Sequence, residues 1–284
     1  MPLQERVKIR RVLTDTPLAR QHDRLIAGGP PRKRTVVPWK RFVRSRYPAP
    51  ALALACKAQT MLAQGEYEAV DLFSRIAGGL AITGAPLDLV AAATRVATDE
   101  IRHADYAFRF AALLGGRDDV VIDVRSKRAE QRWGASLDLE TLDRMMIEIP
   151  AIGEGLACAL LAASRERASD VVARPLYDSI LADEVHHTRL GWYYLAWRAP
   201  QWSVGERQRA ADRAGEAIIE VEKRFWWGRD APAGSRKAAR ALGVLESEGQ
   251  RQVIRQIMEE EIIPALDQLG LGASHAWKVR KRGR

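Results

Sequence analysis

The sequence predicts an all-α protein built around a bundle of four long helices with one long crossover. Four stretches with a helical period of apolar residues follow one another between residues 51 and 197. A region of about twenty residues without a helical period separates the second stretch from the third. The second and fourth stretches carry the same motif, Asp-Glu-x-x-His. Two helical hairpins joined by a long connection would produce this order.

Turn residues fix the ends of the predicted helices. The first helix stops at Gly84, which Pro86 follows, because glycine and then proline commonly end a helix. The crossover after the second helix contains "VVIDV", which has an extended character. Pro150 is expected to kink the third helix. The four helices are predicted over residues 51–83, 86–114, 137–168 and 172–197.

Segments of different character flank the bundle. Prolines interrupt the basic N-terminal arm, which has room for one short helix. Ser203 and Glu206 form a capping-box pattern for a fifth helix that reaches Gly228, and residues 245–271 suggest a sixth. The predicted organisation is a basic arm (1–48), the four-helix bundle (49–200), C-terminal helices packed on the bundle (201–272) and a basic tail (273–284).

The net charge of +9 is concentrated at the two ends. Residues 1–46 hold 13 Lys and Arg against three acids, and "KVRKRGR" adds +5, which leaves −6 for residues 47–277. Such ends could bind nucleic acid or an acidic partner. We expect solvated arms instead, because no aromatic residues are interleaved in a known nucleic-acid motif.

Composition also narrows the compartment and the redox chemistry. No uninterrupted apolar run approaches the ~18 residues of a membrane helix, and the N-terminus lacks a signal-like apolar region, so we expect no membrane and a cytoplasmic protein. Cys56 and Cys158, in different predicted helices, are too few for a disulfide framework or an iron–sulfur module. Electrons for any redox reaction would come from an external donor.

The repeated motif places an acid and an imidazole on one helix face. Residues three apart point the same way on a helix, so Glu100 converges with His103, and Glu184 with His187. His186 is two positions after Glu184, roughly 200° around the helix, and is expected to face elsewhere.

Each copy of the motif has a carboxylate partner on the preceding helix. Glu154 shares the apolar stripe of the third helix, and Glu66 shares that of the first helix, whereas Glu68 lies on a polar face with Gln64 and Arg75. Glu66 and Glu100 lie 18 and 14 residues from their shared turn, about 27 and about 21 Å at 1.5 Å per residue. All six groups can therefore lie in one layer of the bundle.

A buried layer of four carboxylates needs a counter-charge, because each unpaired buried charge costs several kcal/mol. Two divalent cations would supply it, and carboxylates with imidazoles suit iron or manganese better than structural zinc or copper(I). Asp99 and Asp183 could accept the free ring N–H of His187 and His103, respectively. Arg102 either bonds a carboxylate there or reaches solvent.

These segments resemble the ferritin-like di-iron carboxylate superfamily, over roughly residues 60–200. Within it, the chain more closely resembles bacterial ferritin-like domain proteins that mostly lack an assigned function, through "GEYEAVDLFSRI", "TDEIRHADYAF", "GEGLACALL" and "LADEVHHTRLGWYYLAW". Bundles of this superfamily hold their metal ions with a glutamate from each of two helices and a Glu-x-x-His pair from each of the other two. The resemblance implies two iron ions, or manganese or a mixed pair, on the following ligands: Glu66, Glu100, His103, Glu154, Glu184 and His187.

The resemblance implies an oxygen-activating di-iron oxidase or oxygenase acting on a small organic substrate that the sequence does not identify. Dioxygen and an external electron donor are the other expected partners, and a homodimer is a candidate assembly. Two alternatives remain open at this point. One is iron handling, as a ferroxidase or storage subunit, and the other is a non-catalytic bundle whose basic ends bind nucleic acid or an acidic partner.

Overall fold

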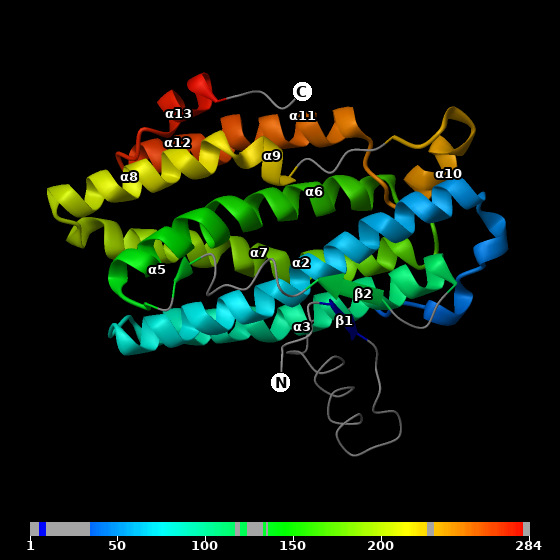
Figure 1. Cartoon of the computed structure of the whole chain (residues 1–284), viewed down its shortest axis with the longest axis horizontal. Coiled ribbons are helices and arrows are strands. Elements are labelled where there is room, and N and C mark those ends of the chain that lie inside the picture. Colours follow the sequence, from blue (N-terminus) through cyan, green and yellow to red (C-terminus); the bar gives the residue numbers. More distant parts are fainter. Residues whose placement is uncertain are drawn as a thin grey trace, which may run out of the picture.

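The computed structural model is a predominantly helical molecule whose long helices lie side by side along its longest axis (Figure 1). It describes residues 6–9, 35–116, 120–123, 133–134, 136–225 and 230–280. Most of the predicted basic arm, the predicted helix end at Gly228 and the last four residues of the tail lie outside these ranges. Within them the predicted all-α class is confirmed.

The four long helices form where the periodicity predicts them. They are α2 (Ala49–Ile82), α3 (Leu87–Gly115), the segment from α5 (Leu139–Met146) to α6 (Glu154–Arg167), and α7 (Ala173–Arg198). Gly84, with φ +71°, turns the chain between α2 and α3, and Gly116, with φ +62°, ends α3. Such backbone angles strongly favour glycine, which explains why these positions ended the predicted helices correctly.

The third helix is widened by a π-helical turn around Pro150. Between α5 and α6, residues Ile147–Gly153 form this turn, and the Glu154 N–H donates to the Ile149 carbonyl five residues back. Proline lacks an N–H and crowds the preceding turn, and one wider turn accommodates both effects without a break. The irregularity expected at Pro150 is therefore present as a π-helical turn, and α6 begins at Glu154 itself.

A close helix contact holds this turn in place. A Cβ built on Gly191 of α7 would lie 2.6 Å from the Pro150 carbonyl carbon and 2.7 Å from the Ala151 Cα. Only glycine allows α7 to approach the π-helical backbone this closely. Since Gly191 is one turn after His187 and Ala151 is three residues before Glu154, the contact sets the position of one motif relative to its partner carboxylate.

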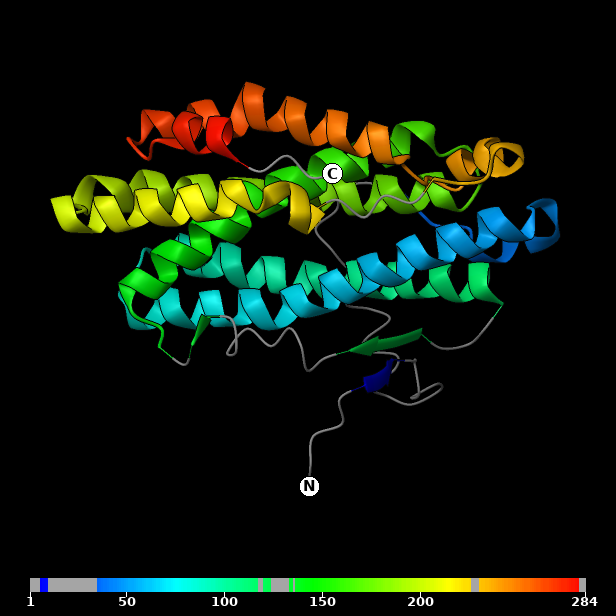
Figure 2. The ribbon, with the colours of Figure 1, turned by 45° about the horizontal axis from the view of Figure 1, so that its top comes forward.

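The C-terminal helices cover one side of the bundle, opposite a small β-ribbon (Figures 1 and 2). Their helices are α8 (Val204–Ile219), α9 (Val221–Phe225), α10 (Arg236–Ala241), α11 (Ser247–Ile257), a π-helical turn (Met258–Ile262), α12 (Ile263–Gln268) and α13 (Ala273–Val279). The predicted capping box is present, because Ser203 and Glu206 satisfy each other's backbone N–H groups at the start of α8.

The ribbon joins the arm to the crossover. Strand β1 (Arg6–Ile9) pairs antiparallel with β2 (Val120–Asp123), with Arg6 opposite Asp123. The extended character of "VVIDV" is thus confirmed, while its partner strand in the arm was not predicted. The end of the arm forms two short 3₁₀ turns, Trp39–Arg41 and Arg44–Arg46.

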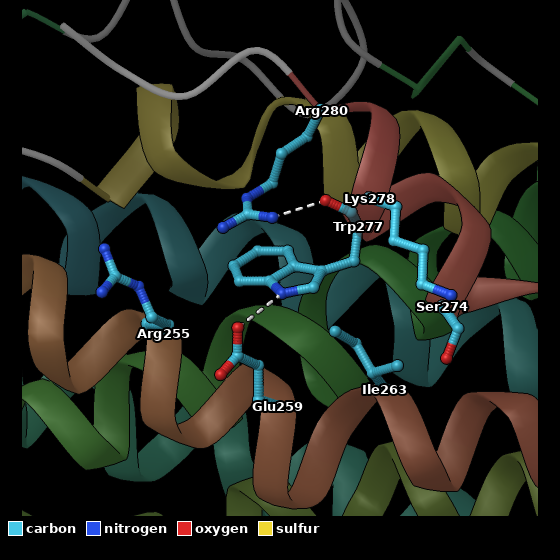
Figure 3. A pocket seen from close by; sticks show the side chains of 7 residues that line it. All are labelled: Arg255, Glu259, Ile263, Ser274, Trp277, Lys278 and Arg280. Atoms are coloured by element: carbon cyan, nitrogen blue, oxygen red, sulfur yellow. Dashed lines mark hydrogen bonds between the residues drawn. The ribbon is translucent and has the colours of Figure 1, made fainter.

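Parts of both predicted solvated ends pack on the bundle. Val37 is buried, and the Ser179 hydroxyl of α7 donates to the Thr35 carbonyl at 2.7 Å. At the other end, α13 packs against α8 and α12. The Trp277 indole N–H donates to Glu259 at 3.0 Å, and the Arg280 guanidinium lies over its ring (Figure 3). Residues 35–47 and 273–280 are therefore structured parts of the molecule.

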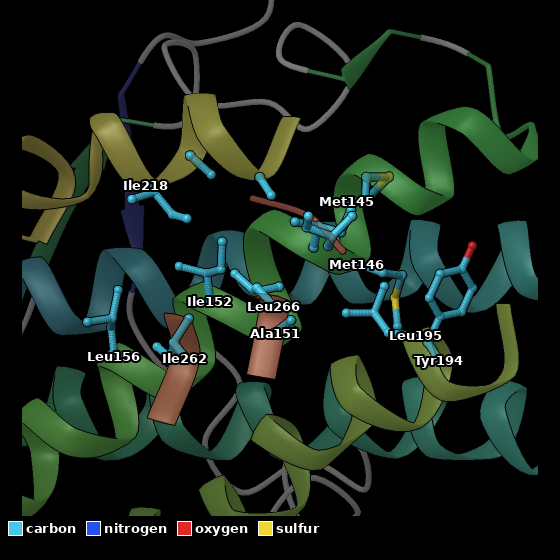
Figure 4. Packing of buried hydrophobic residues seen from close by; sticks show 14 of the residues in the cluster. Met145, Met146, Ala151, Ile152, Leu156, Tyr194, Leu195, Ile218, Ile262 and Leu266 are labelled. Carbon is cyan, nitrogen blue, oxygen red and sulfur yellow. The ribbon is translucent and has the colours of Figure 1, made fainter. Parts of the chain in front are cut away.

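The main core lies between the bundle and the C-terminal layer. Figure 4 shows part of it, with residues of the Leu139–Arg167 segment packed among side chains of α7, α8 and α12. Met145, Met146, Ile152 and Leu156 contribute fully or almost fully buried side chains. Since α5 to α6 is covered on several sides, its sequence is apolar around most of its circumference.

The Leu139–Arg167 segment bears on the expectation that the protein has no membrane helix. By length and composition, Leu139–Arg167 is apolar enough to cross a membrane, although Glu148 and Glu154 interrupt it. Of its most apolar window, 61% is buried inside the protein. A buried core helix meets the same criterion, so this segment is weak support for a membrane span.

We expect Gly191→Ala to lower the free energy of unfolding by about 1–3 kcal/mol or more, because the added methyl meets backbone atoms that cannot move aside. Gly78 of α2, with open space around its Cβ position, is the matched control. Gly78→Ala should raise stability by about 0.5–1 kcal/mol through its better helix propensity. Urea unfolding of both variants measures the difference, and equal effects would contradict the close contact.

Candidate metal centre

Two motif copies on neighbouring helices bring four metal-ligating side chains together in the core. Glu100 and His103 of α3 and Glu184 and His187 of α7 have ligand atoms that all lie within 4.8 Å of one another. Their exposed fractions are 1%, 0%, 1% and 0%, respectively. The predicted spacing of three residues places acid and imidazole on the same face of each helix.

The four side chains are arranged so that each imidazole faces both carboxylates. His103 Nδ1 lies 3.2 Å from an oxygen of Glu100 and 3.2 Å from one of Glu184. His187 Nδ1 lies 3.1 Å from Glu100 and 3.5 Å from Glu184. The centroids of the two imidazole rings are 5.4 Å apart. The Nδ1 atoms and the carboxylates thus converge on one small volume between α3 and α7.

Glu66 and Glu154 lie against this group from the other two helices. The Glu66 carboxyl interacts with Glu100, His103 and Glu184, and the Glu154 carboxyl with Glu184, Glu100 and His187. The predicted pairs Glu66–Glu100 and Glu154–Glu184 are among these interactions. Unlike the four central residues, Glu66 and Glu154 are half-buried. Glu68 hydrogen-bonds to Gln64 at 3.0 Å, as its face predicted, and is half-buried instead of fully solvated.

An outer ring of charges backs the two imidazoles. His187 Nε2 lies 3.7 Å from Asp99, and His103 Nε2 lies 3.6 Å from Asp183, which is the predicted crosswise arrangement at contact distance. A normal hydrogen bond would be a few tenths of an ångström shorter. With Nε2 facing an aspartate, Nδ1 is the nitrogen that faces the site.

Arg102 joins the two aspartates. Its guanidinium donates to Asp99 at 2.8 Å and also to Asp183, and the side chain is 3% exposed. Arg95 adds a second bond to Asp99, at 2.8 Å. Of the two alternatives that the sequence left open for Arg102, bonding a carboxylate is therefore the correct one. Arg95 was not singled out, although its position four residues before Asp99 on the same helix could have indicated it.

Burial and the neighbouring charges raise the pKa values of some groups in the layer and lower those of others. Although burial opposes protonation of the imidazoles, the adjoining carboxylates raise the pKa of His103 and of His187 well above 6.5. Despite burial, those imidazoles hold the pKa of Glu100 and of Glu184 below 4.5. Desolvation and the neighbouring carboxylates raise the pKa of Glu66 and of Glu154.

These pKa shifts favour protonation of the two imidazoles and of the Glu66 and Glu154 carboxyls. With both imidazoles and both half-buried carboxyls protonated, two negative charges meet two positive ones. Releasing those four protons would leave four carboxylates and two neutral imidazoles. Two divalent cations carry the charge that would neutralise that set.

The buried polar atoms of the site fit a metal ion. Both ring nitrogens of His103 and His187, and one oxygen each of Glu100 and Glu184, have no hydrogen-bond partner among the described residues. Unpartnered buried polar atoms are costly and rare unless something binds them. This buried Glu and His cluster could therefore bind metal, and its oxygen and imidazole donors suit iron, manganese or zinc.

Other residues near the site have mainly packing roles. Burial and the site carboxylates raise the pKa of the Cys158 thiol to about 11, so the thiol is not poised as a nucleophile. The buried Tyr194 donates to Asp143 at 2.6 Å, whereas Tyr193 is 59% exposed. His186 is exposed and takes no place in the layer, as its helix position predicted.

No protein-family model, curated protein or solved structure matches this chain.

We expect Glu66→Ala to lower the metal content of the purified protein, because it removes a carboxylate that adjoins Glu100 and His103. Glu68→Ala is the matched control two residues away, since Glu68 bonds Gln64 on another face. It should retain the metal and change stability by no more than about 0.5 kcal/mol. Elemental analysis after anaerobic loading with Fe²⁺ tests both variants, and the opposite ranking would show that Glu66 is not a ligand.

Metal binding should also change how the free energy of unfolding depends on pH. The raised pKa values of His103 and His187 stabilise the metal-free fold fully below 6.5, and this contribution is lost as pH rises through the folded values. The raised pKa values of Glu66 and Glu154 also make the fold less stable as pH rises above 4.5. The free energy of unfolding of the metal-free protein should therefore fall as pH increases above about 6.5.

Added Mn²⁺ should stabilise the protein more at higher pH, because the metal displaces protons from these groups. The lowered pKa values of Glu100 and Glu184 stabilise the fold above 4.5 and are lost only in acid, so they do not interfere. Urea unfolding at several pH values, with and without Mn²⁺, measures both effects. Stabilisation by Mn²⁺ that does not vary with pH would argue against ligation by this layer.

Proposed function

We propose that the chain is a ferritin-like di-iron protein that activates dioxygen to oxidise a small organic substrate. The observation that carries the proposal is the buried layer in which both Glu-x-x-His pairs face each other and each adjoins one further glutamate. This is the ligand arrangement of di-iron and di-manganese carboxylate bundles. Glu66, Glu100 and His103 would hold one ion, and Glu154, Glu184 and His187 the other.

The two ions, when bound, would supply electrons and open coordination positions for dioxygen. The residues of this chain would perform the supporting steps. Glu100 and Glu184, which each face both imidazoles, would supply carboxylate oxygens to the ions. Asp99 and Asp183 would orient the imidazoles through Nε2, and Arg102 would fix both aspartates.

The half-buried glutamates are suited to proton movement. Burial and the neighbouring carboxylates raise the pKa of Glu66 and of Glu154, so these two groups would take up or release protons when the charge of the site changes.

Iron handling is the second candidate, because the same layer could serve a ferroxidase. The C-terminal helices and the packed end of the arm disfavour a storage cage, since they cover surfaces of the bundle that a compact cage subunit would need for contacts with its neighbours. A non-catalytic bundle that binds nucleic acid through its ends has less support, because residues 35–47 and 273–280 pack on the protein.

The deciding experiment loads the metal-free protein with Fe²⁺ anaerobically and then adds dioxygen under stopped flow. We expect two iron ions per chain, rapid oxygen consumption and a transient optical absorption. Glu100→Ala and Glu184→Ala should lose both the metal and the oxygen reaction, whereas Glu68→Ala should keep them. Uptake of many iron ions per chain into large particles would favour storage, and no iron uptake by the wild type would refute the proposal.

A further inference from the structure

A mainly apolar cavity of about 110 Å³ lies beside the metal centre, at the end of the bundle where α2 begins. Its walls come from α2, α6, the N-terminal part of α7 and the turn between α10 and α11. Leu62, Leu161 and Val244 are among its apolar lining residues, and Gln59 and Tyr177 are its buried polar ones. The exposed Lys57 also borders it.

The cavity is displaced from the carboxylate layer by one to two helical turns. Gln59 is seven residues before Glu66 on α2, and Tyr177 is seven residues before Glu184 on α7. Both spacings correspond to about 10 Å along the bundle. Leu62 and Ala157 lie within one turn of Glu66 and Glu154, respectively, and occupy the interval. Three helices therefore place the cavity at the same end of the site.

As whole residues, the ligand candidates on this side are less completely buried than those on α3 and α7. The ligand candidates on α3 and α7 are at most 1% exposed. Glu66 and Glu154, on the two helices that also line the cavity, are half-buried, as are Leu62, Ala157 and Cys158 near them. A molecule in the cavity would thus be on the accessible side of the layer.

One buried polar group in the cavity lacks a partner. The Gln59 side-chain amide donates to the Tyr177 hydroxyl at 2.8 Å, while its carbonyl oxygen has no hydrogen-bond partner among the described residues. Gln59 is 2% exposed, and Tyr177 is 4% exposed. Burial raises the pKa of Tyr177, so its hydroxyl remains neutral and retains a proton to donate. The pair therefore offers one acceptor and one donor.

The turn between α10 and α11 packs against Tyr177. Gly243, with φ +83°, packs on the tyrosine ring, and a Cβ there would lie 2.8 Å from Tyr177 Cζ. The ring is consequently fixed between the turn and Gln59. A buried amide that is held in place but left half-satisfied is expected where a ligand completes its hydrogen bonds.

We propose that this cavity binds the organic substrate, a small apolar molecule with one uncharged hydroxyl or amide head group. The head group would donate to Gln59 and accept from Tyr177, and the apolar part would extend past Leu62 toward Glu66 and Glu154. An uncharged head group is favoured because the buried pair offers no opposite charge to a carboxylate or an ammonium. The role as substrate rests on the proposed function, whereas binding itself does not.

The test is calorimetric titration of the metal-free protein with hexanamide and hexan-1-ol, with hexanoate as the charged comparison. We expect saturable binding of the two neutral probes and weaker binding of hexanoate at neutral pH. Gln59→Leu should weaken hexanamide binding about tenfold, the effect of losing roughly one hydrogen bond. Equal binding by wild type and Gln59→Leu, or no binding of either neutral probe, would overturn the proposal.

A second pair of variants does not depend on changing a buried polar group. Ala58→Phe fills the cavity from a half-buried position on α2, and Ala53→Phe adds the same ring at an exposed position that does not line it. Only the first should abolish probe binding, and both should keep the wild-type metal content. If hexanoate binds best and Lys57→Ala removes that binding, the head-group site is at the rim and the proposal is wrong.

Oxygen consumption by the iron-loaded protein then separates the two proposals. If the cavity holds the substrate, hexanamide should change the oxygen-consumption rate of the wild type but not of Ala58→Phe. Probe binding without any iron uptake would refute the proposed function and leave the cavity assignment standing. Iron uptake and oxygen consumption that no neutral probe alters would refute the substrate role alone.

Discussion

The structure depends on neutralising a layer of carboxylates in the middle of a helical core. Glu100 and Glu184 are almost completely buried, and an unpaired buried carboxylate would cost several kcal/mol. The neighbouring carboxylates raise the pKa of both imidazoles, which favours the opposite charge there, and burial raises the pKa of Glu66 and of Glu154, which favours their neutral forms. The layer also keeps unpartnered buried atoms that a cation would satisfy.

Helix packing around the layer follows from the same constraint. The outer aspartates add negative charge behind the imidazoles, and Arg102, 3% exposed, balances it by bonding Asp99 and Asp183 together. That link ties α3 to α7. On the other hairpin, Gly191 lets α7 contact the backbone of the π-helical turn directly before Glu154. Electrostatics and close packing thus set the positions of the motif helices at the level of the site.

Periodicity and spacing predicted the features that depend on one helix at a time. The four helices, the capping box at Ser203 and the inward face of Glu66 all follow from local patterns within a few turns. The pairing of β1 with β2 brings together segments more than a hundred residues apart, and no local pattern specifies such a partner. The π-helical turn around Pro150 packs against Gly191 of another helix, and no local pattern specifies such a contact. The cavity was likewise not predicted, because Gln59 and Tyr177 meet only in the folded bundle.

The two sides of the layer differ in chemical character: one is a charged network and the other is mainly apolar. Behind the imidazoles, Asp99, Asp183 and Arg102 form a buried charged network. On the side of α2 and α6, the residues next to Glu66 and Glu154 are small or apolar, and a cavity begins within two turns. A charged network holds ligands rigidly but would have to be desolvated and broken to admit a substrate. An apolar wall costs little to occupy. The two sides of one layer would therefore serve different tasks: the charged network would orient the ligands on α3 and α7, while the side of α2 and α6, which also supplies Glu66 and Glu154, would receive the organic molecule.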